Sequence, residues 1–161
     1  MRLLLAILLA PLLLAGQDEK RAKAARPTAE ITLRIVEATS AANAANDAAD
    51  LVPAELKALL RFSKYRLLDS AFLRGVEEET MRVALAGNLS GEVRFEVRSR
   101  QPPVMEFDVE IQGPADPGKR APVLLETTTT AKSGETVVLG ASRMRDSSNA
   151  LIVLLTAKLI P

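Results

Sequence analysis

The stretch VRFEVRSRQPPVMEFDVEI, residues 93–111, holds two runs of alternating apolar and polar side chains, separated by a proline pair. The apolar members are Val93, Phe95 and Val97 in the first run and Met105, Phe107, Val109 and Ile111 in the second. Side chains two residues apart on a strand share one face, so each run is typical of a strand with one buried and one solvated face. Residues 93–111 therefore predict an antiparallel hairpin whose chain reverses at Pro102 and Pro103.

The outer face of this hairpin carries charges of both signs. If the two apolar sets line one core, we expect a register in which Val97 lies opposite Phe107. The polar cross-strand pairs expected in that register are Arg98–Glu106, Arg94–Glu110 and Glu96–Asp108. Because two of these pairs join opposite charges, the pattern favours a solvated charge ladder over a catalytic pair of carboxylates.

Much of the remaining chain also predicts strands. They are expected within residues 30–35, 65–76, 81–85, 122–131, 136–142 and 150–160. Pro53 precedes leucines at helical spacing and predicts a short amphipathic helix over about residues 53–61. Residues 38–50, rich in Ala and Asn, predict a mobile surface loop, with a frayed helix as the alternative. Glu77–Glu79 predict a solvated turn. We therefore expect a mainly β (α+β) fold, an antiparallel sandwich or open barrel of about seven to eight strands with one short helix.

The segment SGETVVLGAS, residues 133–142, predicts a tight turn followed by an apolar strand. Ser133 and Gly134 are expected in a turn that joins residues 122–131 and 136–142 into a second hairpin, with Gly134 at positive φ. Gly140, inside the strand, marks a bulge or a close backbone contact. We assign these residues structural roles, since neither glycine belongs to a phosphate-binding loop.

The last expected strand, residues 150–160, is apolar on both faces. The side chains expected to be buried there are Leu151, Val153, Leu154 and Leu155. Such a strand is typical of the interior of a sheet that is covered on both sides.

The N-terminus has the pattern of a secretory signal. Residues 1–16 place Arg2 before an apolar run and end in small residues, so we expect a signal peptide, with an uncleaved N-terminal anchor as the alternative. Residues 17–27 are polar and predict a tether, and residues 28–161 predict a single β-rich domain. We expect the mature protein to begin near Gln17 and to be periplasmic or otherwise extracytoplasmic, with membrane contact only through residues 1–16 if these remain uncleaved.

The composition excludes several classes of function. The chain has no Cys and no His, which removes Ser-His and Cys-His nucleophile pairs, most zinc and transition-metal sites, and a lipoprotein thiol. Without residues 1–16, the 21 basic residues fall to 20 and match the 20 acidic ones, and the chain has one Tyr, four Phe and no Trp. We therefore expect no nucleic-acid partner, no cofactor, and no catalytic, cofactor-binding or metal-binding residues.

The order of residues 133–141, SGETVVLGA, followed by a closing strand ALIVLLTAKLI, residues 150–160, resembles the C-terminal β-module of the bacterial secretins. These are the outer-membrane channels of type II and type III secretion and of pilus systems. The resemblance is partial and covers about residues 121–160, with a shorter segment between the two strands and Ala157 where the family has proline. It implies a shared β-module and a link to secretion or pilus assembly, and we do not carry channel activity over.

We therefore expect an exported, non-enzymatic envelope protein that binds another envelope protein or serves in an assembly. The alternative is a periplasmic carrier that holds a small apolar ligand or lipid in a β-sandwich or barrel pocket. A carrier should leave a sizeable cavity between its sheets. A protein-binding component should have a filled core and an exposed strand edge or apolar patch.

Overall fold

The computed structural model describes residues 26–115, 117–143 and 148–160. The expected signal, residues 1–16, and most of the expected tether, residues 17–27, lie outside the described residues. The elements are β1 (Thr28–Thr39), η1 (Ala49–Leu51), α1 (Ala54–Leu60), β2 (Lys64–Val76), β3 (Met81–Leu85), β4 (Leu89–Arg100), β5 (Pro103–Gln112), β6 (Val123–Lys132), β7 (Thr136–Arg143) and β8 (Ala150–Ile160). The expectation of a mainly β fold with one short helix is confirmed.

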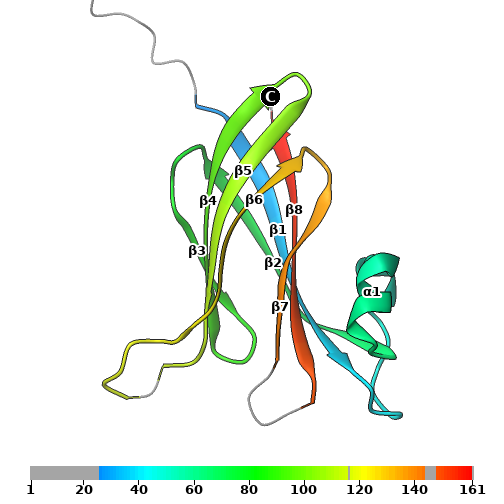
Figure 1. The fold of residues 1–161 in the computed structure, drawn as a ribbon. Helices are drawn as coiled ribbons and strands as arrows, with labels where there is room; N and C mark the ends of the chain where they lie inside the picture. Colours follow the sequence, from blue (N-terminus) through cyan, green and yellow to red (C-terminus); the bar gives the residue numbers. More distant parts are fainter. Residues whose placement is uncertain (1–25, 116, 144–147, 161) are drawn as a thin grey trace, which may run out of the picture.

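The strands form two antiparallel four-stranded sheets, as Figure 1 shows. Sheet A has the order β2-β1-β8-β7, and sheet B has the order β3-β4-β5-β6. β2 contacts β3 along one side of the molecule, and β6 contacts β7 along the other. The expected alternatives were a sandwich and an open barrel, and the structure is a sandwich.

Apolar side chains fill the space between the sheets. The largest fully buried ones in this inner core are Ile31, Leu33, Ile35, Phe95, Met105, Phe107, Ile111 and Leu155. Phe95 and Phe107 lie opposite each other in the β4–β5 ladder, with ring centroids 6.3 Å apart. Because each fully buried side chain of this size contributes about 1.5–3 kcal/mol, the inner core is the main source of stability.

Sheet A has a second apolar cluster on its outer face. In the β1–β2 ladder Ile35 pairs with Asp69 and Val36 with Leu67, so Leu68 is an extra residue that bulges from β2. The buried members of this outer core are Val36, Ala38, Ala48, Val52, Tyr65, Ala150, Ile152 and Leu154. Leu56 and Leu60 of α1 pack against it, so the helix covers one end of the outer face of sheet A.

The expected helix over residues 53–61 is confirmed. α1 follows Pro53 and ends at Arg61, which adopts the left-handed conformation with φ 57° and donates its N–H to the Lys57 carbonyl. Its leucines at helical spacing supply the face that meets sheet A.

The hairpin of residues 93–111 is confirmed, but its expected register is wrong. Val97 lies opposite Met105 rather than Phe107, and Arg94 lies opposite Asp108 rather than Glu110. The ladder shifts between Val97 and Ser99, which leaves Arg98 as an extra residue. Alternation determines which face of a strand is buried. Sliding β4 along β5 by two residues keeps the same side chains inside, so alternation alone cannot distinguish the two registers.

The second expected hairpin is wrong. β6 pairs with β5 and β7 pairs with β8, so residues 132–135 cross from sheet B to sheet A. The Ser133 N–H donates to the Pro103 carbonyl at 3.0 Å, and the Gly134 N–H donates to the Ala157 carbonyl at 2.7 Å. The turn is therefore bonded to both sheets, and a local turn pattern cannot distinguish such a crossing from a hairpin.

Residues 38–50 are attached to β2 rather than forming a free mobile loop. β1 extends to Thr39, and Ala48 is fully buried in the outer core. The Asn46 and Asp47 side-chain oxygens each accept a backbone N–H of β2, from Tyr65 and Leu67 respectively, at 2.9 Å. Short polar side chains thus compensate for the lack of large apolar ones in this segment.

Candidate functional site: the open side of the sandwich

The side of the molecule formed by β2 and β3 is closed by polar side chains. Glu77 Oε1 accepts the Val97 N–H at 2.7 Å, and the Glu78 N–H donates to the Phe95 carbonyl at 2.9 Å. These bonds continue the pairing of β4 beyond the short strand β3. Asp69 accepts the Ala86 N–H at 2.7 Å and so links β2 to the β3–β4 turn.

Both sides of the molecule end in edge strands, since β2 and β3 also pair with one neighbour each. The side formed by β6 and β7 is called the open side because, within the described residues, Lys132 alone donates a β6 or β7 backbone N–H to a side chain, whereas side chains accept the Tyr65 and Leu67 N–H groups of β2. β6 is the last strand of sheet B and β7 the last strand of sheet A, and within the described residues each pairs with one neighbour only. Both strands therefore present backbone N–H and C=O groups to a possible partner strand. Figure 1 shows the two strands at this side of the sandwich.

The residues singled out in the β6–β7 turn hold the open side together at one end. Gly134 has φ +89°, a conformation that favours glycine. The Ser133 hydroxyl accepts the Leu159 N–H at 3.0 Å, next to the Gly134 bond to Ala157. Ser133 and Gly134 thus connect the end of sheet B to the last strand of sheet A.

Gly140 lies at a bulge and at a close contact. The β7–β8 ladder shifts between Val138 and Gly140, so Leu139 is the extra residue. A Cβ at Gly140 would lie 2.7 Å from Cδ1 of Leu125 on β6. The missing side chain therefore allows β6 and β7 to approach each other.

The four β8 residues singled out are buried in two different cores. Leu151, Val153 and Leu155 face the inner core, and Leu154 faces the outer core. β8 lies between β1 and β7 in sheet A. These side chains belong to the interior, and none of them lies on the open side.

The outer face of sheet B carries rows of charged side chains across its strands. Glu92 lies opposite Glu110, and Glu110 lies opposite Glu126 on the edge strand β6. Arg82 forms an ion pair with Glu92 at 2.8 Å. The Glu126 side chain has no hydrogen bond or ion pair with any other described residue. Like charges directly opposite each other destabilise a sheet, so Glu110 and Glu126 form an uncompensated pair beside the open edge.

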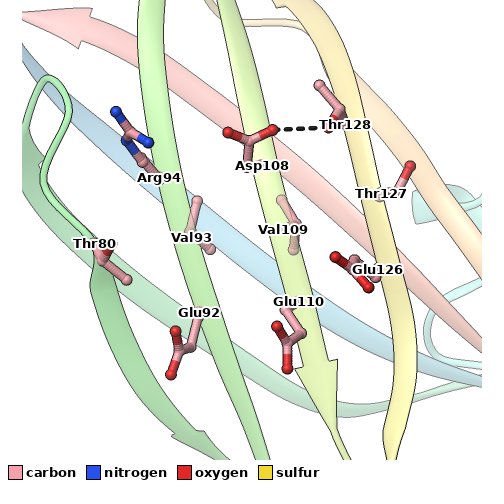
Figure 2. Close-up of a pocket in the computed structure, with 10 residues that line it drawn as sticks. All are labelled: Thr80, Glu92, Val93, Arg94, Asp108, Val109, Glu110, Glu126, Thr127 and Thr128. Carbon is pink, nitrogen blue, oxygen red and sulfur yellow. Dashed lines mark hydrogen bonds between the residues drawn. The ribbon is translucent and has the colours of Figure 1, made fainter.

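A shallow hollow of about 270 Å³ lies among these side chains, and Figure 2 shows the residues around it. It is lined by Thr80, Glu92, Val93, Arg94, Asp108, Val109, Glu110, Glu126, Thr127 and Thr128. The Thr128 hydroxyl donates to Asp108 at 2.7 Å. The hollow is polar and lies outside the sandwich, so it differs from an apolar ligand cavity between sheets.

Among the described residues, two side chains have shifted pKa values. A hydrogen bond to Glu106 raises the pKa of Arg98, which also contacts Glu96. Burial raises the pKa of Tyr65 in the outer core. Neither shift produces a group that exchanges protons near neutral pH, as a general acid or base must.

Metal-binding groups and membrane-spanning helices are absent from the part of the chain that the structure describes. No three His, Cys, Asp or Glu side chains come together there in a way that could hold a metal ion, the three glutamates of sheet B included. No described helix is long and apolar enough to cross a membrane.

Neither the glutamate row nor the open side could be predicted from the sequence. The row depends on the register of three strands, and the open side depends on which strands end each sheet. Alternation identifies Glu92 and Glu110 as outward residues, but it does not show that they lie opposite each other or that Glu126 of β6 lies beside them.

The fold is similar to that of solved secretins. No protein-family model and no curated protein matches the sequence. The type II secretion system secretin GspD of E. coli K12 aligns with a TM-score of 0.50 and 11% identity, over 84% of this chain and 50% of that one. The Salmonella SPI-1 type III secretion injectisome secretin InvG (residues 176-end), in the open gate state, aligns with a TM-score of 0.41 and 10% identity, over 84% of this chain and 61% of that one.

The expected resemblance to secretins is therefore confirmed at the level of the fold. Because 84% of the chain is aligned, the likeness extends beyond residues 121–160, where the sequence pattern placed it. The chain spans about half the length of the GspD structure that it matches.

Proposed function

We propose that the chain is an exported, non-enzymatic envelope protein that binds another protein, as an assembly component linked to a secretin-type secretion or pilus system. The observation that carries this proposal is the combination of a filled inner core with an open side at β6 and β7. A filled core supports a scaffold, and free strand edges are surfaces to which another chain can add a strand.

The fold likeness supports the secretin link, and the signal-like residues 1–16 support export to the periplasm or another extracytoplasmic location. The proposal includes no cofactor, no catalytic residue and no nucleic-acid partner. Its protein partner is identified here only by location, as a component of the same envelope.

The carrier alternative has less support. It needs an apolar cavity between the sheets, whereas the hollow found in the described residues is polar and lies on the outer face of sheet B. The space between the sheets is occupied by side chains such as Phe95 and Phe107.

Photo-crosslinking in the native envelope tests the proposal. A photoreactive amino acid at exposed Thr130 of β6 or Thr136 of β7 should yield a crosslinked product with a distinct envelope protein, identified by mass spectrometry. The same amino acid at exposed Ala58 of α1, away from the open side, is the matched control. Crosslinks equal to those of the control, or a chain that fractionates with the cytoplasm, would contradict the proposal.

A further inference from the structure

The free edge of β6 lacks most of the features that protect edge strands. β6 has ten residues, contains no proline, and holds four consecutive threonines, Thr127–Thr130. Its ladder with β5 has one register shift, near the start of the strand, whereas β7 has eight residues and a bulge in its middle. Natural edge strands are usually blunted by prolines, bulges, charges or short length, so β6 is the more favourable edge for strand addition.

The backbone of β6 indicates which residues would pair. The Lys132 N–H donates to the Glu135 carboxylate at 2.9 Å, within the β6–β7 turn and away from β5. Because N–H directions alternate along a strand, the N–H groups of Glu126, Thr128 and Thr130 are expected to point to the same free edge. An added strand would bond there.

The side chains at this edge carry complementary charges. Glu126 and Lys132 are both exposed and stand on the outer face of β6. Neither side chain has a hydrogen bond or ion pair with another described residue. They lie six positions apart on one strand, so an antiparallel copy of β6 can place each opposite the other.

We propose that two copies of this chain pair through β6, antiparallel, about a two-fold axis at Thr129. In this register Glu126 of one copy lies opposite Lys132 of the other, Thr128 lies opposite Thr130, and the two Thr129 residues face each other. The two B sheets become one continuous sheet of eight strands. The interface is isologous, since each pair occurs twice and closes the dimer.

Three properties of the pairing favour this register. In the two Glu126–Lys132 pairs, the lysine of one copy lies opposite the Glu126 carboxylate of the other. Within one copy, Glu126 lies opposite Glu110 only, which carries the same charge. The Thr128–Thr130 pairs match β-branched residues that stabilise each other across strands. The register also places the free N–H groups of Thr128 and Thr130 opposite each other, as an antiparallel ladder requires. At the ends of the interface, the Lys132 N–H would exchange its bond to Glu135 for the Glu126 carbonyl of the other copy. This pairing would occupy β6, one of the two edge strands on which the proposed function rests, and would leave β7 for a different protein.

Sedimentation of charge variants tests the pairing. The chain from residue 17 onward should pass from monomer to dimer between about 1 and 300 μM, as expected of a small interface. Glu126→Lys and Lys132→Glu should each weaken the dimer about 10-fold or more, because each places like charges at both ends of the interface. Glu55→Lys on α1, exposed and remote from β6, is the matched control.

Mixing the two variants gives the decisive result. A 1:1 mixture of the Glu126→Lys and Lys132→Glu chains should form a heterodimer as stable as the original dimer, since opposite charges then face each other at both ends. The double variant should recover self-association for the same reason. The proposal is overturned if the chain stays monomeric throughout this concentration range. It is also overturned if the dimer dissociation constant is the same for the charge variants as for the original chain.

Disulfide formation tests the register. The chain has no cysteine, so Thr129→Cys introduces a single thiol. Across the two-fold axis the two Cα atoms would lie about 4.5 Å apart, within the range for a disulfide. Oxidation should therefore give a covalent dimer for Thr129→Cys and little for Thr127→Cys, which would face Ala131. The reverse result would overturn the proposed register.

Discussion

Glu77 takes the place of a strand partner for β4. β3 pairs with β4 only as far as Val93, and beyond that point the Glu77 carboxylate accepts the Val97 N–H at 2.7 Å. The adjacent Glu79 is exposed and has no such contact. The expected turn is therefore present, but two of its three glutamates bond to β4, Glu77 through its carboxylate and Glu78 through its N–H.

Replacing Glu77 should destabilise the fold. Glu77→Ala removes a charged acceptor and leaves a partly buried N–H without a partner, at a cost of about 1–2 kcal/mol in the free energy of unfolding. Urea denaturation measures this cost, with Glu79→Ala as the control that should change it little. Equal effects of the two substitutions would show that the Glu77 bond contributes nothing particular.

Tyr65 makes the free energy of unfolding depend on pH in the alkaline range. Burial in the outer core raises the pKa of its phenol above the usual 10.0, because burial disfavours the phenolate. The neutral phenol therefore contributes stability that is present below pH 10 and is lost as the pH rises through the raised pKa. Tyr65→Phe should remove this contribution to the pH dependence.

The phenol can be observed directly, because Tyr65 is the one tyrosine of the chain. Absorbance titration of the phenolate should give a higher pKa for the folded protein than for the protein in denaturant. Identical titration curves would mean that the ring is solvated in solution.

β8 contributes buried side chains to both the inner core and the outer core. Val153 is 2% exposed in the inner core, and Leu154 is 1% exposed in the outer core. This arrangement needs a sheet on one side of β8 and the segment with η1 and α1 on the other.

Substitutions on the two faces of β8 should therefore be similarly severe. Val153→Asp and Leu154→Asp each bury an unpaired carboxylate and should destabilise the fold by several kcal/mol. Lys158→Gln, at an exposed position of the same strand, is the control, because it adds no like charge opposite Glu30. If Leu154→Asp left the thermal midpoint unchanged, the outer core would not form in solution.

The strand and helix positions could be predicted because they depend on local patterns. Alternation marked the buried faces of β4 and β5, and Pro53 with its following leucines marked α1. The register of β4 could not be predicted, since the expected Arg98–Glu106 contact also forms in the observed register, with Arg98 as the bulged residue, and therefore does not distinguish the two registers.

The strand that pairs with β6, and therefore the position of the open side, could not be predicted for a similar reason. The turn at Ser133 and Gly134 is compatible with a hairpin and with a crossing between sheets, and the choice depends on bonds to Pro103 and Ala157, which are distant in sequence. The glutamate row followed from that choice. A pattern along one strand therefore could not predict the glutamate row.

The two sheets are joined differently on the two sides of the molecule. On the closed side, the β2–β3 turn and the Asp69 bond to Ala86 link them. On the open side, the β6–β7 turn is bonded to both sheets through Ser133 and Gly134. The open side is therefore joined by a few hydrogen bonds of one short turn, in addition to side-chain packing between β6 and β7.

A glycine substitution in that turn should affect the whole open side. Gly134 and Gly118 both have positive φ, +89° and +78°, and a Cβ at either would meet no atom within 4 Å. Replacement by alanine strains the backbone at both positions, by about 1 kcal/mol. Gly118 stands in the loop between β5 and β6, which can relax, whereas Gly134 is held by its bond to Ala157.

We therefore expect Gly134→Ala to lower the free energy of unfolding by about 1–2 kcal/mol and Gly118→Ala to change it by less than half of that. Hydrogen exchange should localise the difference, because the Leu159 N–H bonded to Ser133 should lose protection in Gly134→Ala alone. Loss of protection in both variants would indicate a general weakening of the fold. Unchanged protection at Leu159 in Gly134→Ala would show that the turn does not join the sheets, and that side-chain packing alone holds the open side together.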